Sequence, residues 1–212
     1  MKITWLGHSS FLIENKNNVK IITDPFDETV GYNIYKGNVD IVTISHDHFD
    51  HNCTKFIDKD NAKIVDSLDS VEEKGVKITS LPSFHDEVKG AKRGENIIFI
   101  IETDGYKICH LGDLGHSLNK KEIDLLGNID LLLIPVGDNY TINGETASII
   151  AKEINSKITI PMHYQTPQLT FSLDGVENFL TYMKKGEKIN DNSIILEDYL
   201  DDNKNKVLIL NI

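Results

Sequence analysis

The first half of the chain carries short apolar runs separated by turn residues, a pattern that predicts β-strands. Apolar and polar residues alternate over residues 3–13, so we expect a hairpin-like pair of strands interrupted at Gly7 and His8. The runs that follow are rich in Val, Ile and Thr, and each is short enough to be a strand. They cover residues 19–23, 40–44, 76–81, 97–102, 107–110, 131–135, 158–160, 194–196 and 207–210.

Three later segments show the apolar spacing of amphipathic helices, at residues 119–126, 143–154 and 174–183. Strands mixed with helices imply sheets packed against helices, which places the chain in the α/β class. No repeat of fixed period, low-complexity tract or linker-like composition divides the sequence. We therefore expect residues 1–212 to form a single domain.

The composition indicates a globular protein with an acidic surface. Of the 212 residues, 22 are basic and 33 acidic, which gives a formal net charge of −11. This charge repels phosphate backbones and anionic lipids, so we expect a small-molecule substrate and neither a nucleic-acid nor a membrane partner. The two cysteines, Cys53 and Cys109, cannot build a disulfide framework, and no apolar leader or membrane span of roughly 20 residues is visible. We expect a cytoplasmic protein.

Several predicted strands end in a side chain that can bind a metal ion. Polar groups at strand exits converge where the strands share one edge of a sheet. We therefore expect these side chains to lie close together. They are Asp24, His46, His85, Asp113 and His163.

The strongest signal is the run at residues 46–51, in which three histidines and two aspartates follow a strand directly. On a helix, His46 and His48 would point about 200° apart, so they can share an ion only at a strand end or in a loop. Asp50 and His51 then project elsewhere and can serve a second ion. Imidazole with carboxylate suits zinc, iron, manganese or nickel. The alternative is a solvated polar loop, which this density of donors disfavours.

The pattern His46-x-His48-x-Asp50-His51 resembles the signature motif of the metallo-β-lactamase superfamily. Further segments resemble a compact prokaryotic branch of zinc-dependent hydrolases, related to lactonase-like and phospholipase-D-like enzymes. They are residues 5–8, 23–26 and 161–164. The resemblance covers residue 3 to about residue 166. It implies a four-layer αββα sandwich.

The resemblance also implies a dinuclear site and its ligands. The first ion would be held by His46, His48 and His85; the second by Asp50, His51 and His163; Asp113 would bridge both. The cofactors would be two divalent transition-metal ions, with zinc favoured over manganese, iron or nickel. A bridging hydroxide would cleave a small ester, lactone or phosphodiester. Asp50 would orient this hydroxide and accept its proton.

Three further residues are candidates for supporting roles. His8 and Asp24 follow early strands, where relatives carry groups that hydrogen-bond to the ligands and orient them; a turn or cap is the alternative for each. His116 lies three residues beyond Asp113 and either reaches the site or faces solvent.

Other residues with reactive or polar side chains favour structural roles or leave the choice open. His110 lies on the opposite strand face from Asp113, which favours a structural role. Cys53 is expected to act as a small hydrophobic residue rather than a ligand. Tyr140 either lines the pocket or packs. The basic island at residues 90–94 is either a solvated loop or a loop that steers anions to the metals.

Two other functions compete with hydrolysis. The first is redox chemistry, which the same fold can support with two iron ions. The second is metal-dependent binding without catalysis. The short chain has no room for an added flavin domain, and all seven candidate ligands are present, so hydrolysis is preferred.

Overall fold

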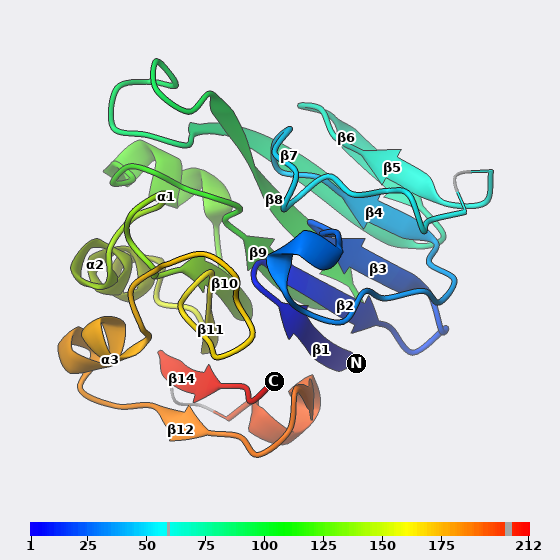
Figure 1. The fold of residues 1–212 in the computed structure, drawn as a ribbon. Coiled ribbons are helices and arrows are strands. Elements are labelled where there is room, and N and C mark those ends of the chain that lie inside the picture. The colour runs from blue at the N-terminus through cyan, green and yellow to red at the C-terminus, as the bar shows by residue number, and fades with distance from the viewer. Residues whose placement is uncertain (59, 202–204) are drawn as a thin grey trace.

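The computed structural model describes residues 1–58, 60–201 and 205–212, which form two β-sheets packed face to face (Figure 1). Among these residues, the six-stranded sheet has the order β13 (Ser193–Ile195), β1 (Lys2–Gly7), β2 (Ser10–Glu14), β3 (Lys20–Thr23), β4 (Ile41–Thr43) and β5 (Lys63–Val65). The eight-stranded sheet has the order β12 (Glu187–Lys188), β14 (Lys206–Ile209), β11 (Ile158–Met162), β10 (Leu131–Pro135), β9 (Tyr106–His110), β8 (Glu95–Thr103), β7 (Val76–Phe84) and β6 (Ser70–Glu73).

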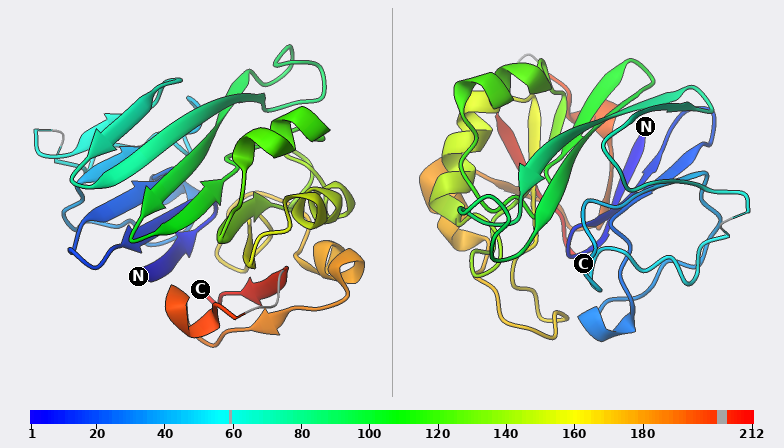
Figure 2. Two further views of the ribbon diagram at one scale, coloured as in Figure 1. Left: turned by 180° about the vertical axis from the view of Figure 1, so that it is seen from behind. Right: turned by 90° about the horizontal axis from the view of Figure 1, so that it is seen from above.

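The α-helices lie together on the outer side of the eight-stranded sheet (Figure 2). They are α1 (Lys120–Leu126), α2 (Gly144–Ile154) and α3 (Glu177–Met183). The side chains of Asn119 and Asn143 cap the first two helices by accepting hydrogen bonds from backbone N–H groups of the first turn. Within the described ranges, no helix is long and apolar enough to cross a bilayer.

The main core fills the space between the two sheets. Trp5 and Phe11 are opposite each other on β1 and β2, and both point inward from the six-stranded sheet. Phe99 and Ile101 on β8 enter the same core from the other sheet. All four are almost completely buried. Burial of each such side chain stabilises the fold by about 1.5–3 kcal/mol.

The sequence pattern located most elements to within a few residues. All three predicted helices and all predicted strands are confirmed, although residue 196 begins the 3-10 helix Leu196–Tyr199 instead of ending a strand. In the part of the chain that the structure describes, three strands were missed: β5, β6 and β12. β6 is a sheet-edge strand of sequence SVEE with no fully buried residue, so it lacks the apolar run by which a strand is recognised.

The predicted α/β sandwich is confirmed, with one difference in its layers. The outer face of the six-stranded sheet carries a second apolar cluster that includes Leu12, Ile22 and Val42. In the described part of the chain, this face is covered by loops that contribute Val39 and Ile57, and the short 3-10 helix Glu28–Val30 lies on the same side. Loops therefore take the place of an α-helical layer there.

Strand direction brings the predicted donors to one edge of the molecule. β3 and β4 are parallel, and β1 has the same direction because β2 is antiparallel to both of its neighbours. In the other sheet, β9, β10 and β11 are parallel, and β7 shares their direction through β8. The carboxyl ends of these strands carry the residues of the site.

Candidate metal centre

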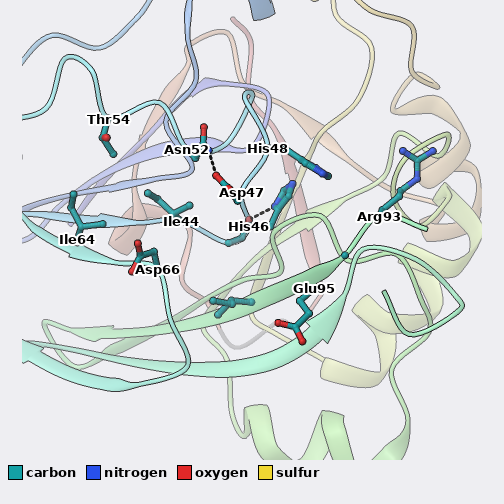
Figure 3. Close-up of a pocket in the computed structure, with 13 residues that line it drawn as sticks. Ile44, His46, Asp47, His48, Asn52, Thr54, Ile64, Asp66, Arg93 and Glu95 are labelled. Carbon is teal, nitrogen blue, oxygen red and sulfur yellow. Dashed lines mark hydrogen bonds between the residues drawn. The ribbon is translucent and has the colours of Figure 1, made fainter. Parts of the chain in front are cut away.

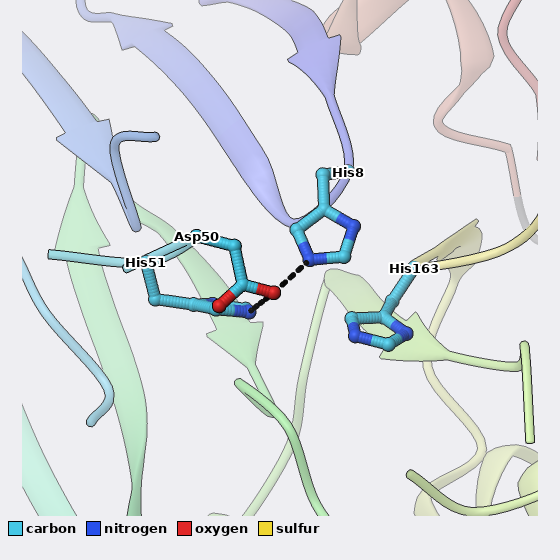
Figure 4. Close-up of side chains that lie close together, drawn as sticks. All are labelled: His8, Asp50, His51 and His163. Carbon is cyan, nitrogen blue, oxygen red and sulfur yellow. Dashed lines mark hydrogen bonds and ion pairs between the residues drawn. The ribbon is translucent and has the colours of Figure 1, made fainter. Parts of the chain in front are cut away.

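Among the described residues, three groups of histidine and aspartate side chains lie close enough to hold a metal ion, and the third, Asp24, His46 and His51, overlaps the other two. In each group, one ligand atom per residue lies within 4.8 Å of the others. The first group is His46, His48 and His85. The second is His8, Asp50, His51 and His163, whose side chains converge from three separate segments of the chain (Figure 4). The structure thus brings together the donors that the strand exits predicted.

Asp113 lies between the two groups. Its Oδ2 is 3.1 Å from Nε2 of His163 and 3.3 Å from Nε2 of both His51 and His85. The side chain is almost fully buried, and its Oδ1 has no hydrogen-bond partner among the described residues. This carboxylate therefore faces imidazoles of both groups.

A tight turn after β9 sets the position of Asp113. Gly112 has φ of 55°, and a Cβ atom there would clash with the side chains of Asn96 and Ser45. Asn96 Oδ1 accepts a hydrogen bond of 2.9 Å from the N–H of Asp113. Only glycine fits this crowded, left-handed position without strain.

The loop after β4 presents His46 and His48 on the same side, as the sequence predicts (Figure 3). Their ring centroids are 4.6 Å apart, and the rings are nearly perpendicular. The N–H of His51 donates to the carbonyl of His48 at 2.9 Å, which closes a turn and directs the later residues of the motif toward the second group.

Three residues of the site have left-handed backbone conformations although none of them is glycine. The φ angles are 51° at His8, 40° at Asp24 and 51° at His163, and all three side chains are buried. Such conformations cost about 1–3 kcal/mol each and persist where the surrounding structure enforces them. Here the N–H of His163 donates to the carbonyl of His8 at 3.2 Å, so the two strained turns support each other.

Asp24 fixes the orientation of two histidines. Its Oδ2 accepts from Nδ1–H of His51 at 2.9 Å and from the hydroxyl of Ser45 at 2.6 Å. Since the Ser45 hydroxyl proton goes to Asp24, its oxygen accepts from Nδ1–H of His46 at 2.9 Å. In their neutral forms both histidines then carry the proton on Nδ1 and turn Nε2 toward the site. Sequence reasoning missed Ser45, although it adjoins the motif directly.

His8 and Asp50 form a buried pair in the second group. Nε2 of His8 is 3.2 Å from Oδ2 of Asp50. Burial and the nearby His163 lower the pKa of His8 to about 4, so its imidazole is neutral at pH 7. Burial would raise the pKa of Asp50, but the hydrogen bond from His8 and the charge of His51 hold it well below its usual range. A neutral His8 therefore donates to an ionised Asp50.

The centre strongly favours positive charge at His51. Burial opposes the imidazolium, yet the nearby charge of Asp113 and the hydrogen bond to Asp24 raise the pKa of His51 well above its usual value. The same contacts hold the pKa of Asp113 well below its usual range despite burial. Two fully buried carboxylates need a cation, whether it is an imidazolium or a metal ion.

The unpartnered atoms of the site fit a metal centre. Nε2 of His46 and Nε2 of His51 are buried and have no hydrogen-bond partner among the described residues, and the same holds for Oδ1 of Asp113. Native proteins rarely leave such atoms unpaired. An unprotonated imidazole nitrogen and a carboxylate oxygen are the donors that divalent transition metals take. The chemistry of the set therefore matches the cofactor that the sequence resemblance implies.

A cavity of about 330 Å³ opens onto these donors. Its polar lining includes His48, Asp50, His85, Asp113 and His163. The rest of its wall comes from Phe49, Arg93, Tyr140 and Phe171. Phe49 and Phe171 were not singled out from the sequence because isolated aromatic residues in loops carry no local signal.

Three residues that carry reactive side chains lie outside the cluster of donors. His116 accepts from the N–H of Phe84 through Nε2 and has Nδ1 2.9 Å from the carbonyl of Ser117, so both ring nitrogens face backbone. His110 uses both ring nitrogens as well, with Nε2 2.8 Å from the carbonyl of Ser9. Cys53 is half-buried and lines a small apolar cavity on the outer side of the six-stranded sheet.

Comparison with known proteins places this arrangement in a family. The family profile described as the beta-lactamase superfamily domain matches residues 2–163. A UPF0173 metal-dependent hydrolase of Pelotomaculum thermopropionicum is 32% identical over 198 residues, which cover 78% of this chain and 85% of the relative. A UPF0173 metal-dependent hydrolase of Archaeoglobus fulgidus is 30% identical over 197 residues, with 78% and 84% covered.

A solved structure matches this chain over its full length and supports the same family. A protein of Thermotoga maritima, assigned as a Zn-dependent hydrolase of the metallo-beta-lactamase superfamily, matches with a TM-score of 0.78 and 36% identity over 99% of both chains. The segment matched by the family profile runs from β1 to His163 and so contains every clustered donor. The chain therefore belongs to the metallo-β-lactamase superfamily, among its metal-dependent hydrolases.

Proposed function

We propose that this protein hydrolyses a small ester, lactone or phosphodiester with two divalent metal ions, zinc foremost. The observation that carries the proposal is the position of Asp113 between the two donor groups, with an unpartnered oxygen. The first ion would be held by His46, His48 and His85, the second by Asp50, His51 and His163, with Asp113 shared between them. His8 and Asp24 would orient the ligands through the hydrogen bonds described above.

Bound divalent ions supply a hydroxide nucleophile near neutral pH and polarise the oxygen under attack. The chain's own contribution begins with Asp50. Its carboxylate is ionised at neutral pH and lines the cavity, so it can hold a proton given up during the reaction. The hydrogen bond from His8 fixes the direction of this carboxylate and keeps it charged.

The cavity sets the size of the substrate. A volume of about 330 Å³ lies at the lower end of the range for ligand sites, which favours a small molecule. Tyr140 and Phe171 pack edge to face, with ring centroids 6.2 Å apart, and form an aromatic part of the cavity wall. Phe49 is 57% exposed at the rim and can cover an apolar part of a bound substrate.

The proposal is tested with protein reconstituted separately with zinc, manganese and iron. Bis(4-nitrophenyl) phosphate, γ-butyrolactone and 4-nitrophenyl pentanoate serve as a phosphodiester, a lactone and an ester, and the His48→Ala variant serves as the control. We expect turnover of at least one compound by the wild type, lost in the variant and after chelation. An absorbance spectrum taken at the same time tests the redox alternative. Absence of turnover with all three metals, or equal turnover by the variant, would overturn the proposal.

A further inference from the structure

The loop after β7 is built around the carboxylate of Asp86. Oδ1 of Asp86 accepts from the N–H groups of Val88 and Gly90, and Oδ2 accepts from those of Lys92 and Arg93, each at 2.8 Å. With four backbone N–H groups bound to one carboxylate, the backbone of this loop is held in one conformation.

The side chain of Arg93 is held by a second set of contacts. Its guanidinium lies over the ring of Tyr140, 4.6 Å from the ring centroid, and Nη2 donates to the carbonyl of Asn139 at 3.2 Å. The side chain of Asn139 in turn donates to the carbonyl of Ser172 at 3.0 Å. Across the described ranges, no carboxylate forms a salt bridge with Arg93. The guanidinium thus keeps most of its N–H donors for another partner.

Arg93 lies at the cavity of the candidate metal centre. It lines the cavity of about 330 Å³ together with Asp113 and His163, and among the described residues that line this cavity it is the only Lys or Arg. It also lines the adjoining cavity of about 770 Å³, in which His46 and His48 take part (Figure 3). Arg93 therefore borders both of the cavities that these donors line.

A purely structural role explains only part of this arrangement. Bracing Tyr140 needs a flat side chain and one donor, but it does not need a half-buried positive charge without a carboxylate partner. Guanidinium binds carboxylate and phosphate oxygens by paired, charge-assisted hydrogen bonds, and stacking on an aromatic ring fixes the plane of those donors. The loop and the ring together pre-organise Arg93 for such a group.

We propose that Arg93 binds an oxyanion, a carboxylate or phosphate, that the substrate carries away from the bond that is cleaved. The substrates are then small anionic molecules, with one end at the donors around Asp113 and the charged end at Arg93. This inference rests on the proposed function for the reaction itself, but binding at Arg93 can be measured without turnover.

The test compares three ligands of similar length by isothermal titration into zinc-reconstituted protein. Pentanoate has one charged end, glutarate adds a second carboxylate, and 4-phosphonobutyrate adds a phosphonate. Wild type is expected to bind glutarate or 4-phosphonobutyrate about tenfold or more tightly than pentanoate. Whichever of glutarate and 4-phosphonobutyrate binds more tightly shows whether a carboxylate or a phosphate group is preferred. Arg93→Ala is expected to reduce the preference to about twofold or less.

Lys92→Ala is the matched control. Lys92 adjoins Arg93, carries the same charge and has an exposed side chain. We expect it to retain the preference within about twofold. Equal affinities in the wild type, a preference that survives in Arg93→Ala, or its equal loss in Lys92→Ala would each overturn the inference. If the proposed function is wrong but this inference is right, the reconstituted enzyme shows no turnover while the binding preference persists.

Discussion

Oδ2 of Asp24 lies 2.9 Å from Nδ1 of His51, and neither side chain is exposed to solvent. The same carboxylate accepts from the N–H and the hydroxyl of Ser45, which in turn contacts His46. One aspartate therefore sets the protonation of a histidine in each donor group. Its left-handed backbone, with φ of 40°, is the cost of bringing it there.

Replacement of Asp24 by Asn is expected to weaken metal binding without removing a proposed ligand. Asn can still accept one hydrogen bond, but it removes the charge that holds the Nδ1 proton on His51. Loss of such a partner lowers metal affinity by about 10- to 100-fold. Competition against a chromogenic chelator measures this affinity. An unchanged affinity would show that His51 does not depend on Asp24.

We expect about two transition-metal ions per chain, and we expect Asp113→Ala to weaken both sites together. The reason is that Oδ2 of Asp113 faces His51, His85 and His163 at 3.1–3.3 Å, so its removal affects donors of both groups. Elemental analysis after reconstitution and removal of excess metal gives the ratio. A reproducible value of one ion per chain contradicts the dinuclear site.

Removal of metal is also expected to lower the melting temperature, since bound metal stabilises the folded state by mass action. Thermal unfolding with and without a chelator tests this. Asp113→Ala should show a much smaller chelator effect than the wild type. An equal effect in both would mean that the stabilising ion is bound elsewhere.

His48→Ala and His110→Ala separate a proposed ligand from a structural histidine. We expect His48→Ala to lose turnover and to lower metal content, because it removes a donor of the first group. His110→Ala should keep its metal, because both ring nitrogens of His110 face backbone. It should instead lower the free energy of unfolding by about 1–3 kcal/mol, since buried backbone groups lose their partners. Metal analysis and denaturant titration of both variants distinguish these outcomes.

Local sequence patterns predicted much of the fold and of the candidate site, since strands and their exits have short-range signatures. The donors at residues 46–51 share one loop, and His85 and His163 directly follow apolar strands. Parallel strand direction then brings these exits to one edge. Whether each donor binds metal stays a prediction until an ion is measured.

Other parts of the site depend on contacts between segments far apart in the chain. Asn96 supports the backbone of Asp113 from the neighbouring strand, and Arg93 meets Tyr140 from another loop. No pattern within either segment records such a pair. The loop cover of the six-stranded sheet was missed for the same reason, because residues such as Val39 and Ile57 have no periodic neighbours that reveal a buried face.

The last prediction concerns the size and charge of the substrate. A structured RNA is held through many phosphates, each neutralised by a basic side chain, and its affinity falls steeply with salt. This chain has a net charge of −11, and its basic island at residues 90–94 holds only two basic side chains, Lys92 and Arg93. A small anion needs only the metal centre and one guanidinium, and repulsion from distant charges is screened beyond about 8 Å.

We therefore expect the metal-loaded protein to turn over a small activated substrate and neither to bind nor to cleave precursor transfer RNA at physiological salt. Gel-shift and cleavage assays run beside the small-molecule assays test this, and efficient RNA cleavage without small-molecule turnover would contradict it.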